Sequence, residues 1–239
     1  MKIYMNILLE AFKQSFELVF TLNADLFEIL LLSLKVSFFS LFFSCLLGLP
    51  LGTFLAIKNF WGRDIVLIFF NTMMGLPPVV VGLIVYLLIS RSGPFGWLGI
   101  LYTPTAMIIA QMILIIPIIV SLTAQTIEDI HQEYKSLFYS LVVPYHKAII
   151  AYLFDARYLI LTVMLAGFGR AISEVGAVII VGGNIDHLTR VMTTTIALET
   201  SKGNLSLALA LGIILLSIAL ITNFILISLK IRAKRRMYV

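Results

Sequence analysis

The fold is decided by residues 149–185, which read IIAYLFDARYLILTVMLAGFGRAISEVGAVIIVGGNI. This run is longer than the roughly 20 apolar residues that cross a bilayer, yet it contains Arg170 and Glu174. Charged side chains are costly in lipid, so they must face protein or water. The preceding residues 130–147 are polar and proline-broken. The sequence therefore predicts a membrane protein with a water-exposed segment followed by a path or gate region.

Composition excludes an ordinary soluble domain. Hydrophobic residues make up 61% of the 239 residues and charged residues only 12%, against about a quarter charged in soluble proteins. The densest basic cluster, at 230–236, directly follows an apolar run, which is typical of a membrane flank rather than of nucleic-acid binding. One cysteine, three scattered histidines and the absence of nucleotide-binding or nucleophile motifs predict no metal, no bound cofactor and no catalytic residue.

The apolar pattern predicts an all-α integral membrane protein with five transmembrane helices plus an N-terminal amphipathic helix. The amphipathic helix at 1–24 is too charged to span and is expected at the bilayer interface. Residues 25–230 form the transmembrane domain, and 231–239 a basic cytoplasmic tail. The predicted spans are about 29–57, 65–90, 104–126, 155–182 and 206–229.

An odd number of spans places the two termini on opposite sides of the membrane. One set of loops carries Lys58, Arg63, Lys135, Lys147, Arg157 and the five basic residues of the tail; the other carries Lys2, Lys13, Arg91, Arg190 and Lys202. Because basic loops stay in the cytoplasm, we expect the N-terminus outside the inner membrane. The C-terminus and residues 127–148 are then cytoplasmic.

Residues 130–147 are predicted to form a short amphipathic helix that stops at Pro144. Such a helix either lies on the bilayer or docks in the groove of a partner, and the residues alone leave both readings open. The residues that define it are Glu133, Lys135, Leu137, Phe138, Leu141, Val142 and Pro144.

Arg170 and Glu174 are four residues apart, so on one helix they share a face and can pair. The pair belongs either to a path or gate, or to a structural contact between helices. Pro77 and Pro78 fall in the second predicted span and release backbone carbonyls there. Lipid tolerates such a break only against protein or a watery cavity.

Hydroxyls at 193–195 and the guanidinium of Arg190 would suit an oxyanion, although Thr is also common in exposed loops. Lys35 either snorkels to the interface or adds positive potential to a path. The complete set of candidate path residues is Lys35, Asn71, Thr72, Pro77, Pro78, Arg170, Ser173, Glu174, Arg190, Thr193, Thr194 and Thr195.

Two long segments carry a resemblance to a known family: residues 166–185, and residues 189–203, which read TRVMTTTIALETSKG. With the five spans, they resemble the membrane subunit of type I ABC importers for oxyanions, and most of all the tungstate permeases. Molybdate permeases are similar more loosely, including at 32–37 and 77–82. The resemblance implies a type I ABC importer permease (MetI-like) fold across about residues 26–230.

The resemblance also implies partners. Two copies would form a homodimer in the bilayer, with an ATP-hydrolysing subunit on the cytoplasmic side and a solute-binding protein outside. Residues 133–147 would be the coupling helix that docks on the ATPase. The family's usual pattern there is Glu-Ala-Ala followed by Gly; here Ser136 holds the Glu position and Val142 the Gly position.

The function that follows is that of a permease subunit of an ATP-driven oxyanion importer, with tungstate as the expected cargo. Molybdate or sulfate import is the nearest alternative. A stand-alone secondary transporter or channel is a further one.

Overall fold

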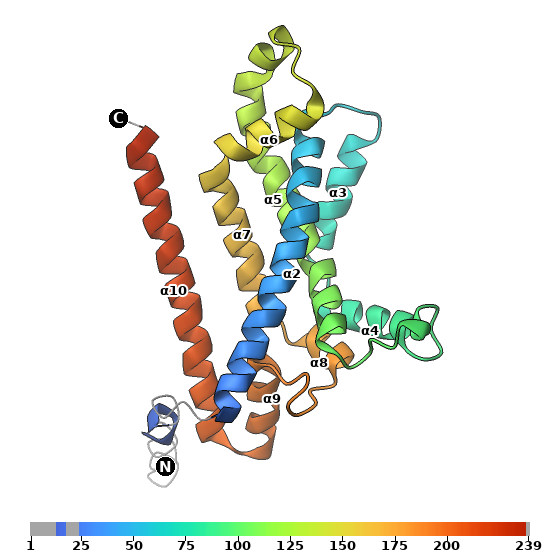
Figure 1. The fold of residues 1–239 in the computed structure, drawn as a ribbon, viewed down its shortest axis with the longest axis vertical. Helices are drawn as coiled ribbons and strands as arrows, with labels where there is room; N and C mark the ends of the chain where they lie inside the picture. Colours follow the sequence, from blue (N-terminus) through green and yellow to red (C-terminus); the bar gives the residue numbers. More distant parts are fainter. Residues whose placement is uncertain (1–12, 18–23, 238–239) are drawn as a thin grey trace. The chain divides into compact units, whose positions relative to one another are not determined.

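Figure 1 shows a computed structural model that describes residues 13–17 and 24–237. Every regular element in these residues is helical, which confirms the all-α prediction. Residues 13–17 are helical, and the rest of the expected interfacial helix lies outside the described residues. The helices are α2 (Ala24–Ile57), α3 (Arg63–Met73), α4 (Pro78–Ile89), the 3-10 helix η1 (Gly96–Leu98), α5 (Pro104–Ser140), α6 (Tyr145–Asp155), α7 (Arg157–Ile172), α8 (Gly176–Gly182), α9 (Met192–Lys202) and α10 (Leu205–Met237).

Three of these helices, α2, α5 and α10, are long and apolar enough to cross a membrane by themselves. Two further pairs, α3 with α4 and α6 with α7, meet the same criterion together but are bent at a short break. The predicted count of five spans therefore holds when each bent pair is taken as one span.

Pro77 and Pro78 produce the first of these breaks. The chain changes direction by 101° between α3, which ends at Met73, and α4, which begins at Pro78. A proline keeps the residue before it out of the helical conformation. Proline also suits the first position of a helix, where its missing N–H would have no partner. The predicted break in this span is thus present, as the end of one helix and the start of another.

The segment 155–182, predicted as one span, is not one continuous helix. α7 ends at Ile172, α8 begins at Gly176, and α7 is instead paired with α6 across an 81° bend. Local capping explains the break after Ile172. The Glu174 carboxylate accepts the Ala177 backbone N–H at 3.2 Å, as acidic side chains do at helix starts.

The expected separate helix at 130–147 is also corrected. α5 runs without interruption to Ser140, and a tight turn separates it from α6. The Val143 N–H bonds to the Phe138 carbonyl at 3.2 Å, and Val142 has φ +51°. This is the Schellman arrangement, whose left-handed residue is usually glycine. Pro144 precedes α6 and does not end the first helix.

The chain divides into two compact units. Unit 1 comprises Met1–Phe38, Pro78–Gln111 and Ile172–Ile221; unit 2 comprises Phe39–Pro77, Met112–Ala171 and Thr222–Val239. In unit 1, α4 packs closely on α8. A Cβ added to Gly82 would lie 2.7 Å from the Ala177 Cα, so only glycine allows this approach.

In unit 2, the second half of α2 packs on α5 through small residues. A Cβ at Gly52 would lie 2.6 Å from the Val120 carbonyl oxygen, and one at Gly48 would lie 2.8 Å from Ile119. α2 continues through Pro50 without ending, so the glycines serve close helix contact. Buried small residues recur every fourth position along this edge: Ser40, Ser44, Gly48, Gly52 and Ala56.

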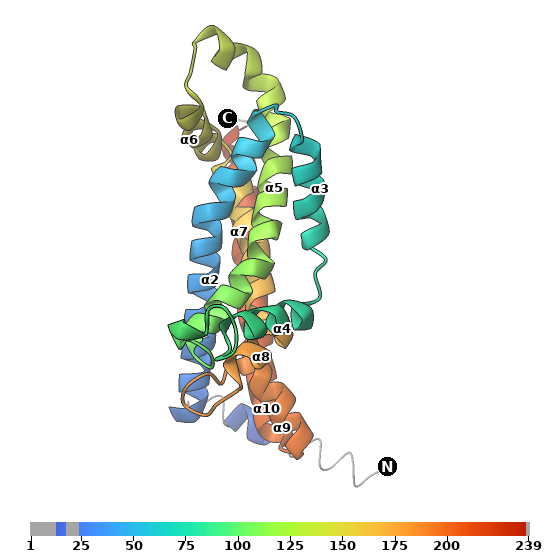
Figure 2. The ribbon, with the colours of Figure 1, turned by 90° about the vertical axis from the view of Figure 1, so that its right-hand side faces the viewer.

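α3 runs alongside α5 in unit 2 (Figure 2). Arg63, the first residue of α3, holds this contact. Its guanidinium bonds to the Glu128 carboxylate at 2.9 Å and to the Leu55 carbonyl at 2.7 Å. One side chain thereby joins α2, α3 and α5.

Candidate functional site

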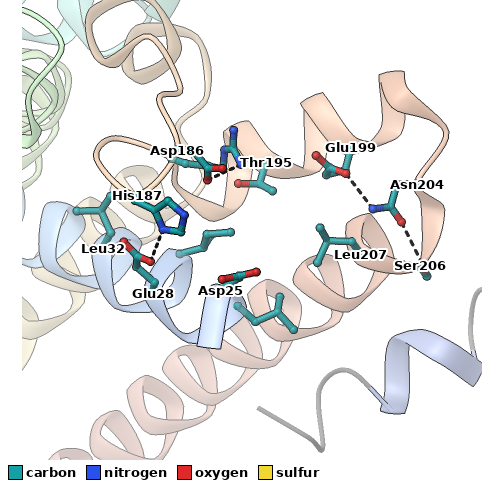
Figure 3. Close-up of a pocket in the computed structure, with 13 residues that line it drawn as sticks. Asp25, Glu28, Leu32, Asp186, His187, Thr195, Glu199, Asn204, Ser206 and Leu207 are labelled. Atoms are coloured by element: carbon teal, nitrogen blue, oxygen red, sulfur yellow. Dashed lines mark hydrogen bonds and ion pairs between the residues drawn. The ribbon is translucent and has the colours of Figure 1, made fainter. Parts of the chain in front are cut away.

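A cavity of about 330 Å³ lies in unit 1 between the first turns of α2, the 183–191 loop, α9 and the start of α10 (Figure 3). Charged side chains reach it from each of the first three elements. Its polar lining residues are Asp25, Glu28, Asp186, His187, Arg190, Thr195, Glu199, Asn204 and Ser206.

Ion pairs connect the elements around this cavity. His187 Nδ1 lies 2.8 Å from Glu28 Oε2, so the loop is tied to α2. Arg190 lies 2.6 Å from Asp186 within the loop. The hydrogen bond to Glu28, strengthened by the charges of Glu28 and Asp186, raises the pKa of His187. His187 therefore stays charged to a higher pH than an ordinary histidine.

A divalent anion is not stabilised in this cavity. Four carboxylates line it, against one guanidinium and one histidine. The guanidinium, that of Arg190, already faces Asp186. Arg190 was expected to contribute to anion passage, but here its charge is compensated and its surroundings are acidic.

The hydroxyls of Thr193, Thr194 and Thr195 are buried in the first turn of α9. Thr193 donates to the Glu174 carbonyl at 2.8 Å, and Thr195 to the Val191 carbonyl at 2.7 Å. The Thr194 hydroxyl lies 2.8 Å from Asn184 Oδ1. Each hydroxyl has a single proton to donate. In this conformation Thr193 and Thr194 tie α9 to its neighbours, Thr195 bonds within the start of α9, and none of the three offers a donor to an anion.

Ser33 completes this arrangement, and sequence reasoning missed it. The backbone N–H of Met192, the first residue of α9, bonds to Ser33 Oγ on α2 at 2.7 Å. The cap of α9 is thus supplied by a residue 159 positions away. No local pattern signals such a cap, since capping residues are normally sought next to the helix that they cap.

Thr194→Val is expected to destabilise the protein by about 1–3 kcal/mol, because it leaves buried polar partners unsatisfied. The hydroxyl also accepts the Val191 N–H at 3.2 Å, so two groups lose a partner. Thermal unfolding of the purified protein measures the effect. Thr200→Val is the matched control, since the Thr200 hydroxyl is exposed and bonds only within its helix; its change should stay within about 0.5 kcal/mol. Equal effects would contradict the structural role of Thr194.

Arg170 and Glu174 do not share one helix. Arg170 is half-buried in the last turn of α7, in unit 2, whereas Ser173 is exposed and Glu174 is buried in unit 1. The helix ends between them, so the spacing argument for their pairing does not apply. Glu174 is placed at the start of α8, where its carboxylate and its carbonyl both accept hydrogen bonds.

The other path candidates lie at more exposed positions. Lys35 is exposed on α2, and Asn71 and Thr72 are exposed in the last turns of α3. The Thr72 hydroxyl donates a hydrogen bond to the Ile68 carbonyl at 2.8 Å. Pro77 and Pro78 shape the backbone between α3 and α4, as described above.

Residues 133–147, here called the elbow, join α5 to α6. Leu141 is 63% exposed and Val142 is 84% exposed, which makes an apolar tip. Phe138 is less exposed than these two residues. Its ring is half-buried and packs edge-on against Tyr152, with ring centroids 4.9 Å apart.

The rest of the elbow contains charged residues on its surface and a cavity next to the tip. Glu133 and Lys135 are exposed on the last turns of α5, and Leu137 lies in the same helix. A cavity of about 230 Å³ opens beside the tip, lined mainly by apolar and aromatic side chains with His131 and Lys135 among them. His131 is fixed by a 2.8 Å contact with the Tyr152 hydroxyl.

Comparison with known proteins adds the remaining observation. Residues 48–234 match the family model described as "Binding-protein-dependent transport system inner membrane component". The chain is 41% identical to a probable anion ABC transporter permease protein of Haloferax volcanii, over 83% of this chain and 88% of that one.

Two tungstate uptake system permease proteins TupB are similar along almost their whole length. The protein of Peptoclostridium acidaminophilum is 37% identical, over 95% of this chain and 99% of its own. That of Campylobacter jejuni is 34% identical, over 96% of both chains.

Proposed function

Since the chain belongs to the family of binding-protein-dependent transport system inner membrane components, we propose that it is the permease subunit of an ATP-driven importer for an oxyanion, with tungstate as the cargo. The similarity to two tungstate permeases over about 95% of the chain carries this proposal. The similar anion permease supports the broader cargo class.

The proposed assembly has two copies of this chain in the membrane, an ATPase pair on the cytoplasmic side and a solute-binding protein outside. ATP binding closes the ATPase pair and moves the elbows together, and the spans then open outward. The binding protein releases its anion into the path, and hydrolysis restores the inward-open state. ATP hydrolysis takes place in the partner subunit.

The elbow is the proposed ATPase contact. Leu141 and Val142 are exposed at its tip, and such an apolar pair suits a contact with a partner protein. The left-handed φ of Val142 supports the assignment, because this is the position where the resembling family places glycine. At this position the backbone is left-handed although the residue is valine.

Positive side chains are proposed to line the path. Arg170 is half-buried within an apolar helix, and Lys35 lies within the apolar run of α2. A cation held at such a position attracts a dianion and lowers its cost of leaving water.

Molybdate and sulfate are the alternative cargoes, since they are also tetrahedral dianions. None of the candidate path residues distinguishes these anions by size. A stand-alone transporter is disfavoured by membership in a binding-protein-dependent family. Proteoliposomes with the permease, its ATPase and its binding protein should take up tungstate only with ATP. Uptake without ATP would contradict the proposal.

Arg170→Ala is expected to lower tungstate uptake by about tenfold or more, as the loss of one charge-assisted contact would, with the assembled complex intact. Uptake by proteoliposomes and size-exclusion chromatography measure the two properties. Arg157→Ala is the matched control on the same helix, where the exposed Arg157 stacks its guanidinium on the rings of Phe154 and Tyr158. Undiminished uptake by Arg170→Ala would remove this residue from the path.

A further inference from the structure

A second cavity in unit 1, of about 540 Å³, lies where the end of α4 continues through η1 to the start of α5. Its polar lining consists of Tyr86, Ser90, Arg91, Ser92 and Tyr102. None of the path residues considered above contributes to it. The cavity is therefore separate from the acidic cavity of Figure 3 in its residues and in its charge.

Arg91 gives this cavity an uncompensated positive charge. It is the only Asp, Glu, Lys or Arg between Asp64 and Glu128 in the sequence, and no carboxylate lines the cavity. Within the described part of the chain, its guanidinium forms no ion pair. Arg63 and Arg190, by contrast, each face a carboxylate at less than 3 Å. The five N–H donors of Arg91 thus remain for a ligand.

Hydroxyl groups line the same cavity as Arg91. Tyr86 and Tyr102 each bring a phenol hydroxyl to its lining. Each phenol has one proton to donate. Ser92 adds a further hydroxyl, whereas the Ser90 proton is donated to the Leu87 carbonyl at 3.2 Å.

The backbone holds Tyr102 at the cavity in an uncommon conformation. Its φ is +61°, in the left-handed region that non-glycine residues seldom adopt. The Tyr102 N–H bonds to the Val181 carbonyl at the end of α8 at 3.0 Å, which fixes this geometry. A Cβ on Gly183 would lie 2.8 Å from the ring. The fold thus holds this ring in place with some backbone strain at Tyr102.

We infer that the Arg91 cavity is a transit site for a tetrahedral oxyanion. The inference rests on the proposed function, and it adds a site to it. The guanidinium supplies charge-assisted hydrogen bonds, and the neighbouring hydroxyls supply neutral ones. The cavity is much larger than one such anion, so water remains around the ligand. The carboxyl end of α4, which carries a partial negative charge, also lies at this cavity. The site therefore binds weakly, as a site that must release its cargo should.

Equilibrium dialysis of the intact permease in nonionic detergent, without binding protein, tests the site. The ligands are tungstate and sulfate, with chloride as the reference anion. The wild type should bind both oxyanions, and Arg91→Gln should weaken that binding by about tenfold or more. Arg91→Lys should keep most of it, since a cation remains. Arg157→Gln is the control for a guanidinium elsewhere on the surface.

Unchanged tungstate binding by Arg91→Gln would overturn the inference. The inference would also be overturned if Arg91→Gln kept tungstate binding but no longer bound phosphatidylglycerol or the solute-binding protein. The ligand of Arg91 would then be a lipid headgroup or a protein carboxylate. ATP-dependent tungstate uptake by the wild type in proteoliposomes tests the proposed function independently of this site. ATP-dependent uptake together with normal anion binding by Arg91→Gln would contradict only the transit site.

Discussion

Leu141→Asp is expected to separate the permease from its ATPase. Leu141 lies at the tip of the elbow, 63% exposed, so a carboxylate there costs the free permease little. In the complex, the same carboxylate would be buried without a partner. Buried contacts of this kind contribute about 2–4 kcal/mol, and their loss lowers affinity by about 30-fold to 1,000-fold. Co-purification of the ATPase in detergent and ATP-dependent uptake measure the result.

Two variants sharpen this test. Leu98→Asp places the same charge on an exposed leucine of η1 in unit 1, and it should leave ATPase binding intact. Val142→Gly removes the side chain from a left-handed position and should stabilise the elbow by about 1 kcal/mol while docking persists. An ATPase that stays bound to Leu141→Asp would show that the elbow is not the docking element.

Gly52→Val is expected to disrupt the packing of α2 on α5. A Cβ at this position would lie 2.6 Å from the Val120 carbonyl oxygen and 2.8 Å from the Thr123 Cβ. Because the nearest atom belongs to the backbone, no side-chain rotation relieves the clash. We expect a loss of about 3 kcal/mol, at the upper end for overpacking, and a Tm lower by about 5–10 °C.

Gly212→Ala is the control for this variant. Gly212 is also helical, in α10, but an added Cβ would meet no atom within 4 Å. Alanine favours the helix by less than about 1 kcal/mol over glycine, so the Tm should stay or rise slightly. Thermal unfolding followed by fluorescence-detected size exclusion compares both proteins. A Gly52→Val protein as stable as the wild type would contradict the contact between α2 and α5.

The sequence predicted those features that follow from local pattern. Apolar runs located α2, α5 and α10, and Pro77 with Pro78 located the break before α4. The sequence predicted that the third span ends near 126, but α5 continues to Ser140. The polar residues after 126 remain helical, and only the turn at Val142 ends the helix. The break after Ile172 was missed because it depends on Glu174 capping a new helix, which hydropathy does not register.

The candidate path was predicted less well, since hydrogen-bond partners are chosen by the tertiary structure. Thr193–Thr195 were correctly noted as a group of hydroxyls, but their acceptors include the Glu174 carbonyl and Asn184, ten or more positions away. Arg190 was predicted to suit an oxyanion, although Asp186, its ion-pair partner, is only four residues before it. Arg91 was counted for topology alone, because a cavity cannot be seen in a sequence.

Val142 bears on how distant relatives of this chain can be found. A search for the glycine of the elbow would pass over this protein, because valine stands there and the neighbouring Glu-Ala-Ala pattern is also lost. In the structure, this turn is recognised instead by one positive torsion angle, followed by the hydrogen bond from Val143 back to Phe138. A search for the turn therefore has to test the backbone conformation as well as the presence of glycine.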